Sequence, residues 1–418
     1  MTSDGQHTPR SRAPDERCRN RERQSERAEP LIDSLAGWRR LLARSPTWGL
    51  AGLLTLTALF ATPSLRAQRT ARAPGIPGAL PRGFVYEYND TYHGWPIAPV
   101  HEQHPVRSSF LDPRGFDENG LAGYHFGIDI SVNDRHPDPG APGLFSHRVY
   151  AVENGLTDVR KGVDSAPCAD RRLGVGHFAY WHVSPTVPDN VWVHAGDQIG
   201  WTCLGQWHVH LSEWQMLDGR HVWVNPLHVH GKLLPYVDTE PPVIRALRFF
   251  TPPLVPWHPR IDLMHPDSAQ RLTTTDLHGR VELRAEIEDL QSFGGWLEFH
   301  RRWETGLHPY RVAVSIRSLA TRALVMSRVA FQSDQIPRTP YLVHYAPGTV
   351  QNVPISQCVA EAATVCTGDL WFRPFSRFKE EFWDTREVHN GRYEVVVRAW
   401  DLKGNMAKRG VGVVVRNP

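Results

Sequence analysis

The 418-residue sequence has few cysteines, few long apolar runs and few stretches of helical periodicity. None of the five cysteines forms a C-x-x-C pair, which argues against a structural zinc site built on cysteine. Helical patterns are scarce after residue 70, and the 34 prolines and 15 tryptophans favour β-structure with long irregular connections. With 22% charged and 41% apolar residues, the composition is that of a globular chain long enough for two domains.

One uncharged apolar run stands out, TWGLAGLLTLTALFA at residues 47–61. It is shorter than the ~20 residues of a membrane span and has the length of a signal-peptide core. An Arg-rich segment precedes it, and Ala67 offers a small residue before a cut at Gln68. We therefore expect residues 1–67 to be an export signal with a long basic front, and the protein to be periplasmic, extracellular or associated with the cell envelope. An uncleaved anchor and a start codon placed too early remain open alternatives.

The charge of the chain beyond that signal excludes one class of partner. Without residues 1–67 the chain has 36 basic and 37 acidic residues, and no basic block remains. Since nucleic-acid binding rests on clustered Lys and Arg, we expect no nucleic-acid partner.

Four cysteines remain once Cys18 is removed with the signal: Cys168, Cys203, Cys358 and Cys366. An even number in an exported chain predicts two disulfides, for which three connectivities are possible. We favour Cys168–Cys203 and Cys358–Cys366, because each of these pairs stays within one domain.

The organisation of the chain follows from composition. Residues 68–99 are rich in Pro, Gly and Arg and predict a linker or lead-in. A first domain spans residues 100–236. The segment VDTEPPVI then predicts an extended connector, because its paired prolines exclude helix. A second domain covers residues 237–418.

Alternating apolar residues predict strands in this second domain. One apolar face comprises Val281, Leu283, Ala285 and Ile287, with Glu282, Arg284, Glu286 and Glu288 on the other; a second comprises Tyr393, Val395, Val397 and Ala399. A KGN turn and a closing GVGVVV strand follow. This strand–D-x-x-G-N–strand ending resembles bacterial immunoglobulin-like β-sandwich domains.

The first domain contains a constellation of possible metal ligands. In YHFGIDIS, His125 and Asp129 are four residues apart on a predicted strand. Residues i and i+4 of a strand share a face but lie ~13 Å apart, so one ion can take both only if the chain bends. Gly127 lies between them and could provide that bend.

Two further segments supply imidazoles. YWHVS contributes His182, and GQWHVHLSEW places His208 and His210 on the same face of a predicted strand. Nitrogen and carboxylate ligands together suit Zn²⁺, and a catalytic zinc typically has three protein ligands and one open position.

The order of these motifs carries a family resemblance. H-x-G-x-D, Y-x-H-x-S, V-x-x-G-D-x-I-G and H-x-H, followed by DGRHVWVNPL, resemble the lysostaphin/LytM-type zinc metalloendopeptidases over residues 124–227. The resemblance implies an all-β domain with the β-sheet core of the duplicated hybrid motif class. It also implies a bound Zn²⁺ ligated by His125, Asp129 and His210, with His182 and His208 as the unligated catalytic pair beside it.

The sequence departs from the family pattern in three places. Residues 132–146 form a longer polar loop, LGQW replaces the usual Gly-rich approach to H-x-H, and Ser212 stands where the family has an acidic residue, with Glu213 one step later. No H-E-x-x-H motif is present, so a thermolysin-like glutamate base is not expected.

The sequence therefore predicts an exported zinc metalloendopeptidase that hydrolyses peptide cross-links of bacterial peptidoglycan. Two other hypotheses remain open. One is a non-catalytic envelope protein that binds the cell wall or regulates a wall hydrolase through the same fold. The other is a binding protein whose C-terminal β-sandwich contacts wall glycan or another protein while the first domain is a scaffold.

Overall fold

The computed structural model describes the chain between residues 87 and 418 with several gaps. The described ranges are 87–116, 122–132, 136–143, 145–160, 172–203, 206–252, 269–292, 306–339, 343–346, 349, 370–376 and 382–418. They lie in one compact unit, Ile76–Pro418. The predicted export signal and the cysteines other than Cys203 lie outside these ranges. Cys203 is disulfide-bonded, and its pairing with Cys168 stays a prediction.

The all-β prediction is confirmed across these ranges. A 3₁₀ turn lies at Thr385–Glu387, and the Asp384 side chain caps it by accepting from the backbone N–H of Arg386. None of the helical structure in this part of the chain is long and apolar enough to cross a membrane. The scarcity of helical periodicity in the sequence thus agrees with the predominance of strands in the described ranges.

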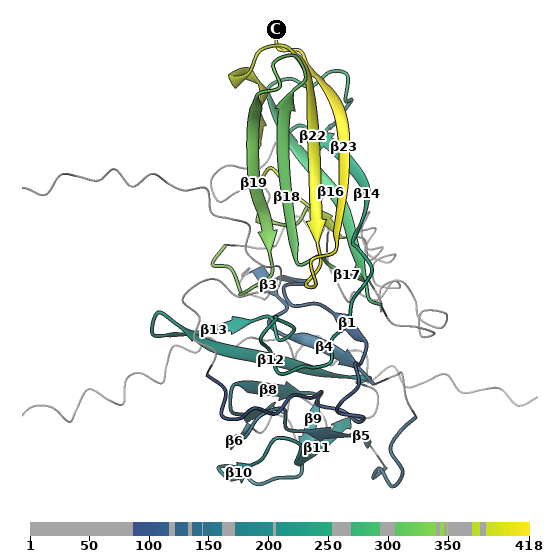
Figure 1. Cartoon of the computed structure of the whole chain (residues 1–418), viewed down its shortest axis with the longest axis vertical. Coiled ribbons are helices and arrows are strands. Elements are labelled where there is room, and N and C mark those ends of the chain that lie inside the picture. The colour runs from purple at the N-terminus through teal and green to yellow at the C-terminus, as the bar shows by residue number, and fades with distance from the viewer. Residues whose placement is uncertain are drawn as a thin grey trace, which may run out of the picture. The chain divides into compact units, whose positions relative to one another are not determined.

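The largest sheet has eight strands from the first half of the described chain (Figure 1). Its strands are β1 (Val106–Ser108), β4 (Ile128–Ser131), β6 (Gly155–Arg160), β7 (Arg172–Val175), β8 (Phe178–Trp181), β10 (Trp192–Val193), β12 (His208–Leu217) and β13 (Arg220–Val224). Their order is β1-β4-β12-β8-β7-β6-β10, and β13 pairs with β12. β12 therefore lies between β4 and β8, and neither of these strands is its neighbour in the sequence.

Two smaller sheets accompany it. A three-stranded sheet of order β5-β11-β9 is formed by β5 (Phe145–Tyr150), β9 (Val183–Pro185) and β11 (Gln198–Cys203). A two-stranded ribbon joins β2 (Pro113–Phe116) to β3 (Ala122–Tyr124). β8 and β9 belong to different sheets although only one residue separates them.

The second half of the described chain forms two further sheets (Figure 1). One contains β14 (Val243–Phe250), β15 (Arg271–Leu272), β16 (Arg280–Leu290), β17 (Gly306–Leu307), β20 (Trp371–Phe372) and β21 (Trp383–Asp384). The other contains β18 (Arg311–Ser318), β19 (Leu324–Gln332), β22 (Gly391–Trp400) and β23 (Met406–Val415), in the order β19-β18-β22-β23. The predicted turn at residues 403–405 connects β22 and β23, and Gly404 in it has a positive φ of 93°.

The predicted apolar faces of β16 and β22 are both buried. The polar face of β16, however, is not solvated as its alternation predicted. Glu282, Arg284 and Glu288 are buried too, because Arg373 pairs with Glu282 and Arg245 pairs with Glu288. Both faces of β16 are thus largely buried, and Glu286 is the partly exposed residue of its predicted polar face.

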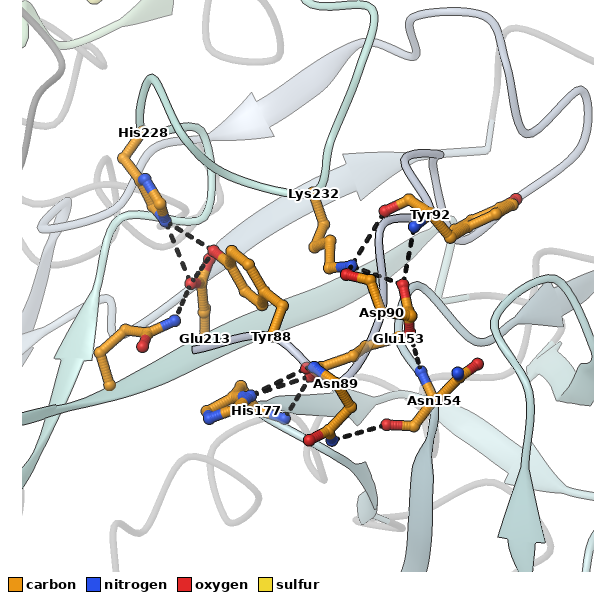
Figure 2. Close-up of polar contacts among 11 residues, drawn as sticks. Tyr88, Asn89, Asp90, Tyr92, Glu153, Asn154, His177, Glu213, His228 and Lys232 are labelled. Carbon is orange, nitrogen blue, oxygen red and sulfur yellow. Dashed lines mark hydrogen bonds and ion pairs between the residues drawn. The ribbon is translucent and has the colours of Figure 1, made fainter. Parts of the chain in front are cut away.

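The described end of the predicted lead-in, from residue 87, packs against the sheets through a polar network (Figure 2). Trp95 is fully buried, and its indole Nε1 donates to the carbonyl of Pro235 at 2.8 Å. The buried Lys232 ammonium donates to Asp90 Oδ1 at 2.6 Å, to the Asp90 carbonyl at 2.7 Å and to the Tyr92 carbonyl at 3.0 Å. These bonds tie the segment to the chain that follows β13.

Candidate metal centre

Three strands carry or adjoin the residues predicted to form the metal site. On β12, His210 lies opposite Asp129 of β4 on one side and opposite Trp181 of β8 on the other. Because side chains alternate along a strand, His208, His210 and Ser212 face the same side of β12. The sheet pairing thus brings together segments that the sequence keeps about 80 residues apart.

The three predicted ligands converge on one point. His125 Nε2 lies 3.0 Å from Asp129 Oδ1, and His210 Nδ1 lies 3.1 Å from the same oxygen. The two ring nitrogens are 2.8 Å apart. All three side chains are buried, and they form one of the two groups of potential metal ligands in the described part of the chain.

The outward nitrogens of both imidazoles also have partners. His125 Nδ1 lies 2.8 Å from the carbonyl oxygen of Ser109, which can only accept, so Nδ1 carries a proton. His210 Nε2 lies 2.8 Å from the Ser212 hydroxyl. In neutral imidazoles this arrangement turns the Nε2 lone pair of His125 inward, and it allows the same for Nδ1 of His210.

This donor set fits zinc. Two imidazole lone pairs and one carboxylate oxygen at about 3 Å from one another repel unless a proton or a cation lies between them. A tetrahedral zinc with bonds of about 2.0–2.1 Å separates its ligand atoms by about 3.4 Å, close to the separations observed here. The second ring nitrogen of each histidine is fixed by an oxygen, as is usual for metal-binding histidines.

The bend expected between His125 and Asp129 is present at Gly127. His125 lies before β4 rather than in it. Its ring therefore reaches Asp129, whereas the two residues would be ~13 Å apart on one straight strand. A Cβ atom on Gly127 would lie 2.4 Å from the Leu211 carbonyl oxygen and 2.7 Å from His210 Nε2. Glycine is therefore required at this position for β12 to approach so closely.

His208, predicted to be catalytic, lies beside the three ligands. Its Nε2 atom is 3.6 Å from Asp129 Oδ1, and its Nδ1 atom is 2.5 Å from the carbonyl of Gln206. Burial lowers the pKa of His208 well below 6.5; Asp129 partly opposes that shift, whereas Arg107 and His182 add to it. At neutral pH the ring is thus neutral, with Nδ1 donating to Gln206 and Nε2 available as an acceptor.

His182 is the second predicted catalytic histidine. Its ring centroid lies 4.6 Å from that of His208, and its side chain is more exposed than those of the three ligands. It occupies the single position between β8 and β9 with a left-handed φ of 62°. Such a conformation is uncommon for a residue other than glycine and is concentrated at functional sites.

Aromatic side chains flank the centre, and the sequence analysis did not identify them. The ring of Phe126 lies 4.8 Å from that of His210 and 5.5 Å from that of Trp223, and the ring of Trp181 lies 6.2 Å from His210. Trp181 could have been identified from the sequence, because it directly precedes the predicted catalytic residue His182. The rings of Phe126 and Trp181 thus pack beside the His210 imidazole.

The groups that contact the outward nitrogens of His125 and His210 were also not predicted from the sequence. Ser212, which stands where the family has an acidic residue, bonds to His210 and could have been found because it shares a strand face with it. Glu213 does not replace that acid: it faces the opposite side of β12 and accepts a hydrogen bond from Tyr88 at 2.6 Å (Figure 2). The Ser109 carbonyl left no signal in the sequence, because backbone groups are present at every position.

Comparisons with known proteins give no further assignment. No family model, curated protein or solved structure matches the chain.

Proposed function

We propose that this chain is an exported zinc metalloendopeptidase that hydrolyses peptide cross-links of bacterial peptidoglycan. The observation that carries the proposal is the convergence of His125, Asp129 and His210, each predicted as a ligand from motif order alone. The unligated pair His182 and His208 lies beside them, as the resemblance to the lysostaphin/LytM-type enzymes implies.

The finer fold assignment belongs to the same proposal. The sheet that holds β4, β8 and β12 would form a duplicated-hybrid-motif core, and β14 to β23 would form an immunoglobulin-like sandwich. The sandwich would contact the cell wall or another envelope protein. Strand alternation, the β12–β13 hairpin and the β22–β23 hairpin support these assignments.

The chain's own groups have distinct roles in this reaction. Zinc, when bound, would act as a Lewis acid toward a substrate carbonyl and a water molecule. His208 accepts a proton at Nε2, because its Nδ1 proton is committed to the Gln206 carbonyl. His182 is more exposed and adjacent to His208, so it is placed to donate a proton to the leaving amine.

Zinc content and cell-wall hydrolysis test the proposal together. The purified full chain should contain about one zinc per molecule, measured by elemental analysis, and release free amino groups from purified peptidoglycan. Asp129→Ala and His210→Ala should lose both the metal and the activity. His194→Ala and Asp197→Ala are matched controls, because this second His–Asp pair has side chains 71% and 53% exposed.

Each outcome discriminates between functions. A folded wild-type chain that takes up no zinc overturns the proposal. A chain that binds zinc through these ligands yet cleaves neither peptidoglycan nor glycine-rich peptides favours the non-catalytic envelope protein.

A further inference from the structure

A second group of potential metal ligands consists of three aspartates. Asp238 lies in the connector before β14, Asp289 lies in β16, and Asp401 directly follows β22. One carboxylate oxygen from each lies within 4.8 Å of the other two, and all three residues are buried. Three carboxylates in a buried site repel one another unless protons or a cation neutralise them.

Hydrogen bonds hold two of these carboxylates from behind. Asp238 Oδ1 accepts from the Ser292 hydroxyl at 2.9 Å and from the Glu240 backbone N–H at 3.2 Å. Asp401 accepts from Asn405 twice, from the backbone N–H at 2.8 Å and from the side-chain amide at 2.6 Å. The carboxylates are therefore fixed in place by donors outside the cluster.

Two carboxylate oxygens of the cluster have no hydrogen-bond partner in the described structure, which indicates that a ligand binds there. Asp289 is only 4% exposed, and its Oδ1 atom has no hydrogen-bond partner in the described structure. Asp238 Oδ2 is likewise buried without a partner there. Two orphaned carboxylate oxygens in one cluster are costly unless a further group satisfies them.

A nearby lysine does not fill this role. The Lys403 ammonium lies over the ring of Tyr236, 5.1 Å from its centroid. Within the ranges the structure describes, it makes no ion pair with any of the three carboxylates. Burial raises the pKa of Asp238 to about 6 and raises the pKa values of Asp289 and Asp401, as expected for carboxylates without a close cation.

A small cavity lies against Asp289, one of the three aspartates. Its volume is about 20 Å³, and Asp289, Tyr236 and Leu402 are among its lining residues. A cavity of about 10–15 Å³ or more has room for one water molecule. This cavity thus has space for one water molecule beside Asp289.

We propose that Asp238, Asp289 and Asp401 bind one Ca²⁺ ion. A donor set of carboxylate oxygens alone suits a hard cation rather than zinc, which prefers nitrogen and sulfur. Mg²⁺ is usually bound through one or two carboxylates and keeps several of its own water molecules, so three buried carboxylates favour Ca²⁺. The ion joins the connector, β16 and the β22–β23 turn, and it stabilises the start of the second set of sheets.

Calcium binding by the full chain tests this assignment. After metal depletion, Ca²⁺ is added alone and followed by titration calorimetry, while the unfolding temperature is recorded with and without it. Wild-type protein should bind about one Ca²⁺ and unfold about 5 °C higher when Ca²⁺ saturates the site. Asp289→Asn should abolish both effects, and Asp276→Asn, which alters a side chain 54% exposed, should preserve them.

The opposite results are equally definite. Absence of heat and of any temperature shift at about 10 mM Ca²⁺ overturns the proposal, as does unchanged binding by Asp289→Asn. If Asp289→Asn does not fold, Asp238→Asn gives the same test from the connector. An equal stabilisation by Mg²⁺ overturns the choice of calcium, and zinc content measured in parallel separates this site from the His–Asp centre.

Discussion

The Nε2 atom of His125 lies 2.8 Å from the Nδ1 atom of His210, although 85 positions of sequence separate the two residues. The Ser109 carbonyl accepts from Nδ1 of His125, so the proton of this neutral ring is on Nδ1. The lone pair on Nε2 of His125 therefore points at Nδ1 of His210. Asp129 Oδ1 lies 3.0 Å from the same His125 nitrogen. The three side chains therefore form a group that could hold a metal ion.

Replacing Gly127 with alanine should disrupt the proposed metal centre although none of the predicted ligands is replaced. The added Cβ meets backbone at Leu211 and the ring of His210, and overpacking of this kind costs about 1–3 kcal/mol of folding stability. Zinc affinity should fall as His210 is displaced, measured by competition with a chelating dye. Gly412→Ala is the matched control, since nothing lies within 4 Å of its added Cβ, and an equal effect in both variants would contradict this explanation.

Removing the hydroxyl of Ser212 should weaken zinc binding by about 10–100-fold, the usual effect of losing a group that orients a metal ligand. The reason is that His210 Nε2 loses its partner at 2.8 Å. The dissociation constant of zinc measures the effect. Ser327→Ala alters an exposed serine on β19 and should leave the constant unchanged; unaltered zinc affinity in Ser212→Ala would exclude an orienting role.

The two unligated histidines should separate metal binding from turnover. We expect His208→Ala and His182→Ala to keep zinc and to lower kcat on peptidoglycan peptides by about 10²–10⁴-fold, the range for losing a general acid or base. His194→Ala should retain wild-type kcat. A variant that loses its zinc would instead assign the altered histidine to the ligand set.

The buried Lys232 should be a strong determinant of stability. Its ammonium is fully buried and donates to Asp90 and Tyr92 (Figure 2). Lys232→Met leaves the Asp90 carboxylate without its cation and should cost about 3–5 kcal/mol in urea unfolding, as breaking a buried ion pair does. Lys408→Met, at an exposed position of β23, should cost far less. A similar loss in both variants would mean that the network contributes little.

The three aspartates predict how stability depends on pH in calcium-free protein. Their pKa values are raised on folding, so between about pH 4 and pH 6 the folded chain binds more protons than the unfolded chain. This contribution to stability is present at low pH and is lost as pH rises through the raised pKa values, which is about 6 for Asp238. The neighbouring Lys403 and Tyr236, whose pKa values burial shifts down and up respectively, remain charged and neutral over this range.

Urea unfolding at pH 5 and pH 7.5 measures that dependence. The fall in stability from pH 5 to pH 7.5 should be steeper in wild-type protein than in Asp289→Asn, because the variant removes one of the raised carboxyl groups. Saturating Ca²⁺ should raise the stability of wild-type protein at pH 7.5 and so reduce its fall in stability between pH 5 and pH 7.5. Parallel pH dependence in the two proteins would show that the cluster does not titrate on folding.

Much of the fold was accessible from local patterns. The absence of helical periodicity and the alternation of Val281 to Ile287 and of Tyr393 to Ala399 predicted an all-β chain, because side-chain direction in a strand is set by the backbone alone. The burial of Glu282 could not be predicted from the sequence, since its partner Arg373 lies 91 positions away in the chain. Alternation predicts which residues share a face but not what covers that face.

The sequence by itself determined which residue types could hold a metal, and in which order His125, Asp129, His182, His208 and His210 follow along the chain. Tertiary structure decided the rest. The pairing of β4 with β12 brought the ligand atoms to about 3 Å, a backbone carbonyl selected the tautomer of His125, and a left-handed turn placed His182. Asp238, Asp289 and Asp401 share no motif, and only the packing of a connector, a strand and a turn makes them neighbours. Local patterns depend on residues a few positions apart, whereas a binding site depends on distances that are fixed only when strands pair.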